Sequence, residues 1–182
     1  MDKGYKIRDQ NGLYFVTFAV VEWVDVFTRK EYADIVVESL IFCQKIKGLE
    51  IYSWCLMSNH LHLIVAAKEG YYLSDILRDF KKYTAKEILS AIDQNQSESR
   101  RNWMLWIFKQ AGIKNTRNSS FQFWRQSNQP KELLTNRFKD QKLEYIHNNP
   151  VESGIVKCPQ DYVYSSAINY SGEQGLIDVI LL

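Results

Sequence analysis

Residues 49–67, LEIYSWCLMSNHLHLIVAA, decide the fold because they contain two strands joined by a tight connection. Residues 49–57 and 60–67 are rich in aliphatic, aromatic and β-branched side chains, which favour extended structure. Ser58 and Asn59 between them belong to residue types that are common in turns. The sequence therefore predicts two paired, largely buried strands, around which the rest of the chain is expected to pack.

The second of these strands carries two of the chain's three histidines, His60 and His62. Because side chains alternate along a strand, both imidazoles project from one face, while Leu61 and Leu63 project from the other. The two histidines lie about 6.6 Å apart along the strand, at ~3.3 Å per residue, so both rings can reach one metal ion. Histidine is a common metal ligand. A hydrogen-bonded pair on a solvated sheet face is the open alternative.

The patterns on either side predict further strands and helices. Alternating apolar residues predict a strand over 13–24, and residues 29–48 show helical spacing that stops at Gly48. A second amphipathic helix is expected over 73–92, beginning with the cap-type residues Ser74 and Asp75. FQFWRQ (121–126) predicts a fourth strand. The last predicted helix covers residues 135–149, opened by Thr135 or Asn136 and ended by Pro150.

This order of elements, βαββαβα, predicts one α+β domain over residues 1–182, a ferredoxin-like sandwich with helices packed on an antiparallel sheet. The length of 182 residues suits a single core. Residues 93–120 are expected to form an insertion or mobile flap, and residues 151–182 an irregular tail. No apolar run approaches the ~20 residues of a membrane helix. The three cysteines are far apart, which indicates neither disulfides nor a cysteine metal site, so we expect a cytoplasmic protein.

The charge is unevenly distributed, although the net charge is only +2. Between Arg100 and Lys142 ten basic and two acidic residues give a net +8, and the segment also contains aromatic residues at 103, 106, 108, 121, 123 and 124. Basic residues interleaved with aromatics are typical of proteins that bind single-stranded nucleic acid. A solvated basic surface over an aromatic core would give the same pattern.

The final helix adds a tyrosine to the candidate residues. Tyr145 and Asn149 are four residues apart and share a helix face, whereas His147 is rotated by about 200° from Tyr145 at ~100° per residue. Tyr145 lies off the centre of the apolar side marked by Leu143 and Ile146. A half-buried tyrosine at the edge of the core fits this position too, and His147 is expected to be a capping or surface residue.

Three motifs in this order resemble one family. HLH on a strand, YIHNNPVESGIV at the end of a helix and DYVYSSAINY after it are similar to the single-tyrosine HUH transposases of the IS200/IS605-like superfamily. The match is closer to the REP-associated tyrosine transposase (RAYT) branch and runs from the first strand to about Tyr170. The insertion-sequence branch typically has Gln at the position of Asn149. The asparagine of this chain agrees with the REP-associated pattern instead.

The resemblance implies a metal-dependent enzyme that cleaves and joins single-stranded DNA near a hairpin. It implies that Tyr145 is the nucleophile, forming a covalent 5′-phosphotyrosine, and that His60, His62 and Asn149 bind a divalent metal. Mg²⁺ or Mn²⁺ suits two imidazoles and one amide oxygen. The expected partner is hairpin-containing single-stranded DNA, bound by a monomer or a homodimer. Candidate DNA contacts, at positions that also suit ordinary surface charges, are Lys81, Lys82, Lys86, Trp124 and Arg125.

Two other functions remain open at this point. A domesticated DNA-binding protein would keep the fold without cleaving DNA, although the four intact residues of the candidate site argue against it. A metal-dependent phosphodiester hydrolase would use water, with His147 as a third imidazole, although the helical phase of His147 argues against that arrangement.

Overall fold

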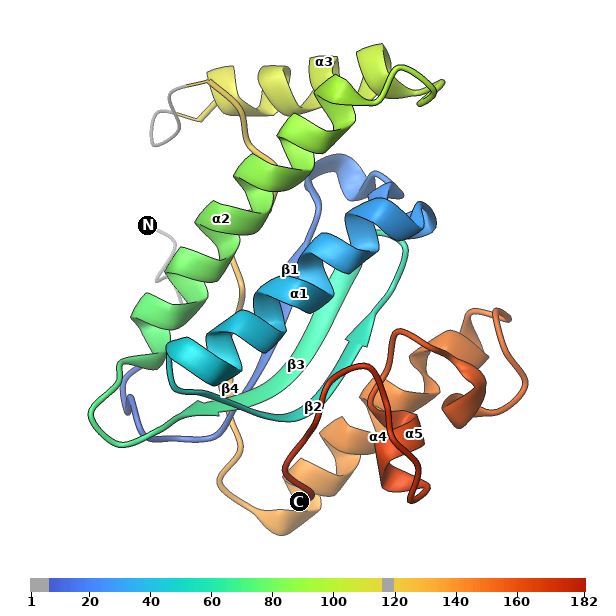
Figure 1. Ribbon diagram of the computed structural model, residues 1–182. Coiled ribbons are helices and arrows are strands. Elements are labelled where there is room, and N and C mark those ends of the chain that lie inside the picture. Colours follow the sequence, from blue (N-terminus) through green and yellow to red (C-terminus); the bar gives the residue numbers. More distant parts are fainter. Residues whose placement is uncertain (1–6, 116–119) are drawn as a thin grey trace.

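The computed structural model describes residues 7–115 and 120–182, and its centre is a four-stranded antiparallel sheet (Figure 1). The sheet has the order β2-β3-β1-β4. Its strands are β1 (Tyr14–Ala19), β2 (Leu49–Leu56), β3 (His60–Ala67) and β4 (Lys131–Glu132). β3 lies between β1 and β2 and runs antiparallel to both, so β1 and β2 are parallel and flank it. This split βαβ arrangement confirms the predicted ferredoxin-like α+β fold.

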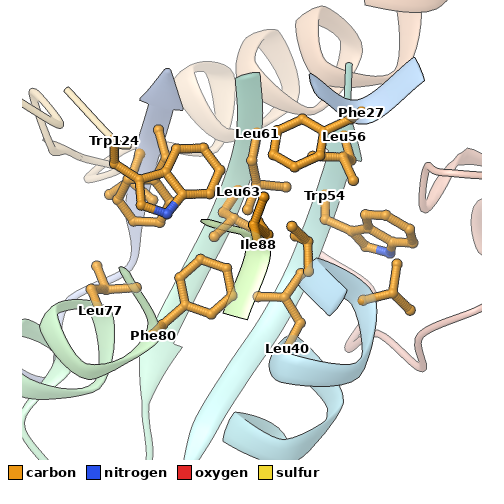
Figure 2. Packing of buried hydrophobic residues seen from close by; sticks show 14 of the residues in the cluster. Phe27, Leu40, Trp54, Leu56, Leu61, Leu63, Leu77, Phe80, Ile88 and Trp124 are labelled. Carbon is orange, nitrogen blue, oxygen red and sulfur yellow. The ribbon is translucent and has the colours of Figure 1, made fainter. Parts of the chain in front are cut away.

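One face of the sheet is covered by α1 (Lys30–Ile46) and α2 (Leu73–Gln94), which cross it side by side (Figure 1). Leu61, Leu63 and Val65 project from β3 toward these helices and are fully buried. Figure 2 shows Leu40 of α1 and Phe80 of α2 meeting the leucines of β3 in this main core. Burying this apolar face is the largest source of stability that the fold has.

The opposite face is covered by α4 (Asn136–Glu152), and its core is much smaller. Ile146 of α4 packs with Phe15 of β1 and Ile64 of β3. The predicted start of this helix is confirmed, because the Thr135 hydroxyl caps it by accepting a hydrogen bond from the Phe138 amide at 3.2 Å. Its predicted end is wrong by three residues.

Pro150 lies inside α4 because it removes only one hydrogen-bond donor near the end of the helix, where few turns remain to be disrupted. The Ser153 amide still donates to the Asn149 carbonyl at 3.0 Å. Gly154, at φ 70°, then ends the helix in the left-handed conformation that a side chain disfavours. The helix therefore runs past the proline to Glu152.

The predicted strand at residues 121–126 is wrong. This segment makes only an isolated bridge between Val20 and Trp124, and the fourth strand is the short β4, paired with Tyr14 and Phe15. Phe123 and Trp124 are neighbours, yet both are buried in the main core. A regular strand would send them to opposite faces. The first strand is also shorter than predicted, because Val21–Trp23 form a 3-10 turn in which Glu22 and Trp23 have positive φ.

Residues 93–120, expected to form an insertion or flap, contain a regular helix, α3 (Arg101–Ile113). Met104 and Phe108 of α3 are fully buried in the main core, which explains why the segment is helical. The turn before it is fixed by Glu98, whose buried carboxylate pairs with Arg29 at 3.1 Å and Arg100 at 3.2 Å. Residues 116–119, with Arg117 of the basic segment, lie outside the described residues.

The C-terminal segment, expected to be irregular, covers the outer edge of β2. It contains a 3-10 turn (Pro159–Asp161) and a one-turn helix, α5 (Ala167–Tyr170). The Leu56 amide donates to the Tyr164 carbonyl at 2.8 Å, and the Ile180 amide donates to the Ile51 carbonyl at 2.9 Å. These bonds satisfy backbone groups that an edge strand would otherwise expose. Within residues 7–115 and 120–182, no helix has the length and apolar character needed to cross a membrane.

Candidate active site on the α4 face of the sheet

The start of β3 places His60 and His62 on the sheet face that α4 covers. In the β1–β3 register, His60 lies opposite Ala19 and His62 lies opposite Thr17. The two imidazole rings have centroids 4.6 Å apart at an interplanar angle of 74°. The strand period thus brings both rings together, as the sequence predicts.

Each imidazole is oriented by a hydrogen bond at Nδ1. His60 Nδ1 lies 2.7 Å from the side-chain oxygen of Asn59, and His62 Nδ1 lies 2.8 Å from the Thr17 hydroxyl. The Asn59 oxygen can only accept, so the proton of neutral His60 is on Nδ1 and its Nε2 carries a lone pair. The Thr17 hydroxyl can accept in the same way and leave Nε2 of His62 free to act as an acceptor or ligand.

The helix α4 brings Tyr145 and Asn149 to the same place. The side-chain nitrogen of Asn149 lies 3.3 Å from His62 Nε2, and the Tyr145 ring centroid lies 5.2 Å from that of His62. Tyr145 remains 41% exposed. Ile146, which follows Tyr145 in the chain, is fully buried, and its packing fixes the rotation of α4 about its own axis. His60 and His62 of β3 therefore meet Tyr145 and Asn149 of α4 in one cluster. The side of this cluster at Tyr145 is open to solvent.

The electrostatics of the site keep the histidines neutral. His62 is only 4% exposed, and burial lowers its pKa to about 3, helped by the nearby His60 and Lys142. Burial lowers the pKa of His60 as well. The desolvated imidazolium form is disfavoured, so both rings keep an unprotonated nitrogen at neutral pH.

Lys142 supplies positive charge beside the tyrosine. Lys142, one turn before Tyr145 on α4, places its ammonium 5.3 Å from the centre of the Tyr145 ring and 5.0 Å from that of Phe15. Burial, with the like charge of Lys131, lowers the pKa of Lys142. The geometry is that of a cation held against aromatic faces.

His147 lies in a different environment from the other two histidines. Its Nε2 lies 2.9 Å from the Ser166 hydroxyl and 3.2 Å from the Ser53 hydroxyl, and its ring packs on Tyr170. The sequence predicted a capping or surface residue, and this prediction is wrong. His147 instead links α4 to β2 and the C-terminal segment. Burial lowers its pKa to about 4. This position separates His147 from the site and contradicts the arrangement in which it is a third imidazole there.

The candidate DNA contacts are scattered. Lys82 and Lys86 line a groove between α1 and α2, on the sheet face opposite the histidines. Lys81 donates to the Arg125 carbonyl at 2.8 Å and to the Asn128 side chain at 2.7 Å, and burial lowers its pKa to about 8. These three lysines are not gathered around the histidines and Tyr145.

Trp124 and Arg125 are neighbours in the chain but differ in placement. Trp124 is 4% exposed, lies in the main core (Figure 2) and donates from its indole nitrogen to Thr84 at 2.9 Å. Its buried ring offers no face to a base in this structure, unlike what we expected from the sequence. Arg125 is exposed and lies over the ring of Trp23 at 5.4 Å. The Trp23 and His60 rings are in T-shaped contact, so Arg125 lies near the site.

Sequence reasoning missed the residues that support the imidazoles. The Asn59 amide nitrogen donates to Asp25 at 3.2 Å and to the Trp23 carbonyl at 3.1 Å, which directs its oxygen toward His60. Thr17 is the polar residue in the middle of an otherwise apolar strand, and this was an available signal. Trp23 and Asp25 gave none, because α1 and β2 separate them from β3 along the chain, and no local pattern shows that they come together.

Comparisons with known proteins identify the family of the chain. A family model described as "Transposase IS200 like" matches residues 11–111, more than half of the chain. The chain belongs to the IS200-like transposase family. The matched segment of this transposase contains His60 and His62, while Tyr145 and Asn149 lie beyond it.

One solved structure extends the likeness of fold to the rest of the transposase chain. A REP-associated tyrosine transposase bound to a REP hairpin superposes with a TM-score of 0.67 at 19% sequence identity, covering 100% of this chain and 95% of that chain. A putative transposase from Deinococcus radiodurans gives a TM-score of 0.44 at 19% identity, covering 81% of this chain and 97% of that one. No curated protein matches the chain.

Proposed function

We propose that this transposase is a metal-dependent enzyme of the REP-associated type, which cleaves and joins single-stranded DNA beside a hairpin through Tyr145. The observation that carries the proposal is the meeting of Tyr145 and Asn149 with His62, itself paired with His60. Membership of a transposase family and a fold like that of a protein bound to a REP hairpin support DNA as the substrate.

The residues that would hold a divalent metal are His60, His62 and Asn149. The described residues contain no group of three His, Cys, Asp or Glu side chains suited to a metal, so the third protein ligand here would be an amide. The donor set fits Mg²⁺ or Mn²⁺, because two neutral imidazoles present Nε2 lone pairs while Asn149 can turn its oxygen inward by rotating its amide. When bound, such an ion would polarise the phosphodiester as a Lewis acid.

Tyr145 would attack the phosphorus atom with its phenol oxygen. A new bond forms between that oxygen and phosphorus, and the bond from phosphorus to the 3′ oxygen breaks. The leaving oxygen takes up a proton to become a 3′-OH, and the tyrosine proton passes to solvent or a base. One phosphodiester-type linkage replaces another, so a 3′-OH can later reverse the step and join strands without ATP.

Lys142 would assist the tyrosine in this step. Its ammonium lies against the Tyr145 ring at 5.3 Å, where positive charge stabilises negative charge developing on the phenol oxygen. The exposed side of Tyr145 gives a DNA strand access to the oxygen. The hydrogen bonds that His60 and His62 donate to Asn59 and Thr17 would keep the imidazoles fixed as the phosphate enters.

The direct test is the formation of a covalent adduct. The protein is incubated with a hairpin-bearing single-stranded oligonucleotide and Mn²⁺ or Mg²⁺, then denatured, and the protein is examined for attached DNA. We expect an adduct with the wild type and with Tyr83→Phe, a control for an exposed tyrosine on the opposite side of the sheet. We expect none with Tyr145→Phe.

Other outcomes identify the alternatives. DNA binding without any adduct or cleavage would favour a domesticated DNA-binding protein. Cleavage that persists in Tyr145→Phe would favour a metal-dependent hydrolase using water, although the position of His147 beside Ser53 and Ser166 removes the third imidazole expected for it. An equal adduct yield from Tyr145→Phe would contradict the assignment of the nucleophile.

A further inference from the structure

We propose that Trp23 and Arg125 form a binding subsite for an unpaired nucleobase next to the cleaved phosphate. We call this pair the Trp23 platform. The inference rests on the proposed function, because it takes single-stranded DNA to lie across the histidines and Tyr145. Neither the family match nor the sequence patterns point to Trp23.

The backbone at Trp23 holds the side chain out of the core. Glu22 and Trp23 have φ of 52° and 54°, a left-handed conformation that is unfavourable for residues other than glycine. Hydrogen bonds from neighbouring segments maintain it. The Val21 amide donates to the Phe123 carbonyl at 2.9 Å, and the Asn59 side chain donates to the Trp23 carbonyl at 3.1 Å. Strained backbone of this kind is characteristic of functional sites.

The Trp23 ring is exposed at a position where it touches the candidate active site. It remains 51% exposed, and its centroid lies 5.9 Å from that of His60 at an interplanar angle of 83°. With His62 and Tyr145 it completes a row of four rings, whose successive centroids lie 5.9, 4.6 and 5.2 Å apart. A phosphate at the histidines and Tyr145 would therefore have a neighbouring base within reach of Trp23.

Arg125 gives the Trp23 platform a positive charge. Its guanidinium carbon lies 5.4 Å from the centre of the Trp23 ring. The Arg125 backbone is anchored on both sides, since its amide donates to the Ala19 carbonyl and its carbonyl accepts from Lys81, both at 2.8 Å. An indole face with an adjacent guanidinium is the combination that binds a stacked base and its phosphate in single-strand sites.

The other exposed tryptophans provide matched controls. Trp103 and Trp106 on α3 are 52% and 61% exposed, which is similar to Trp23. Among the described residues, neither Trp103 nor Trp106 has a ring contact with His60 or His62. All three tryptophans are therefore exposed, but of these three Trp23 alone lies beside the site.

The test measures binding in EDTA, so that neither metal nor cleavage is needed. The probe is a hairpin oligonucleotide with a short unpaired flank, in which each flank base is removed in turn to leave an abasic site. Stacking on an aromatic ring contributes about 1–3 kcal/mol per base, so Trp23→Ala should weaken binding about 10-fold. Trp23→Phe should lose less, and Trp103→Ala should stay within about twofold.

One abasic position should be coupled to Trp23. Removing the base there should weaken binding to wild type about 10-fold but have little further effect on Trp23→Ala, as expected for two groups that contact each other. Arg125→Ala should reduce the slope of log affinity against log salt by about 1. Thermal unfolding of each variant verifies that it is folded. If Trp23→Ala is unstable, the two single variants Trp23→Phe and Arg125→Ala provide the test instead.

Two results would overturn the subsite. The first is equal loss of affinity in Trp23→Ala and Trp103→Ala, and the second is an abasic penalty that is unchanged by Trp23→Ala at every position. Failure of the proposed function gives a different pattern. In that case no covalent adduct forms with metal present, while the coupling between Trp23 and one base is still measurable in EDTA.

Discussion

The two faces of the β-sheet differ in what they bury, although the same strands form both. Toward α1 and α2, β3 presents Leu61, Leu63 and Val65, all fully buried in the main core. Toward α4 it presents His60, His62 and Ile64, and only a small apolar cluster surrounds the histidines. The alternation of side chains along one strand therefore separates the main core from the candidate site.

Removing the phenol oxygen should have the largest effect and should affect only the α4 face. In Tyr145→Phe no oxygen can attack, so cleavage should fall by at least about 10⁴-fold, as is found when other enzymes lose their nucleophile. Cleavage rates on a hairpin oligonucleotide measure this. The urea midpoint should stay close to that of wild type because Tyr145 is 41% exposed. Loss of folding would show that the two faces are not separable.

Truncation on the other face should have the opposite outcome. Leu63→Ala leaves a cavity in the main core and should lower the free energy of unfolding by about 2–5 kcal/mol. Urea denaturation measures the loss. The adduct yield per folded molecule should remain near that of wild type, so a selective loss of activity would mean that the leucine side of β3 also positions the histidines.

The amide of Asn149 allows a finer test of the α4 face. Asn149→Ala should weaken Mn²⁺ affinity by at least about 10-fold, measured by calorimetry on the protein without DNA. His147→Gln changes another polar residue of the same helix and should leave Mn²⁺ affinity unchanged, because His147 contacts Ser53 and Ser166. Equal losses in both variants would return His147 to the list of candidate ligands.

Acid should destabilise the metal-free protein because it protonates His147 on the α4 face. This is the smallest of the four predicted effects. The folded state lowers the pKa of His147 from its ordinary 6.5 to about 4 by burial. Below pH 6.5 the unfolded chain therefore binds a proton that the folded chain does not, and stability is lost progressively down to pH 4. His62, with a pKa of about 3, acts in the same direction.

Through His147, the free energy of unfolding should fall by on the order of 1 kcal/mol over the first pH unit below 6.5. Unfolding by urea in EDTA at several pH values measures it. His147→Gln should have a shallower dependence on pH than wild type, while Leu63→Ala should keep the wild-type slope. Identical slopes in wild type and His147→Gln would contradict the assignment to His147.

Much of the fold could be predicted because its signals are local. The pair of strands around Ser58–Asn59, both long helices and the cap at Thr135 follow from periodicity and residue type. The wrong predictions occur where tertiary packing overrides those signals. Phe123 and Trp124 are both in the main core, Met104 and Phe108 draw α3 onto the same core, and α4 continues through Pro150.

The candidate site divides along the same line. His60 and His62 share a face of β3, and Tyr145 and Asn149 share a face of a helix; both could be predicted from the sequence because each follows from the period of a single element. Tertiary packing brings these two faces together and turns His147 toward Ser53 and Ser166. It also buries Trp124 and leaves Trp23 exposed beside His60. The physical reason is that contacts between elements depend on packing over distances in the chain that no local period records.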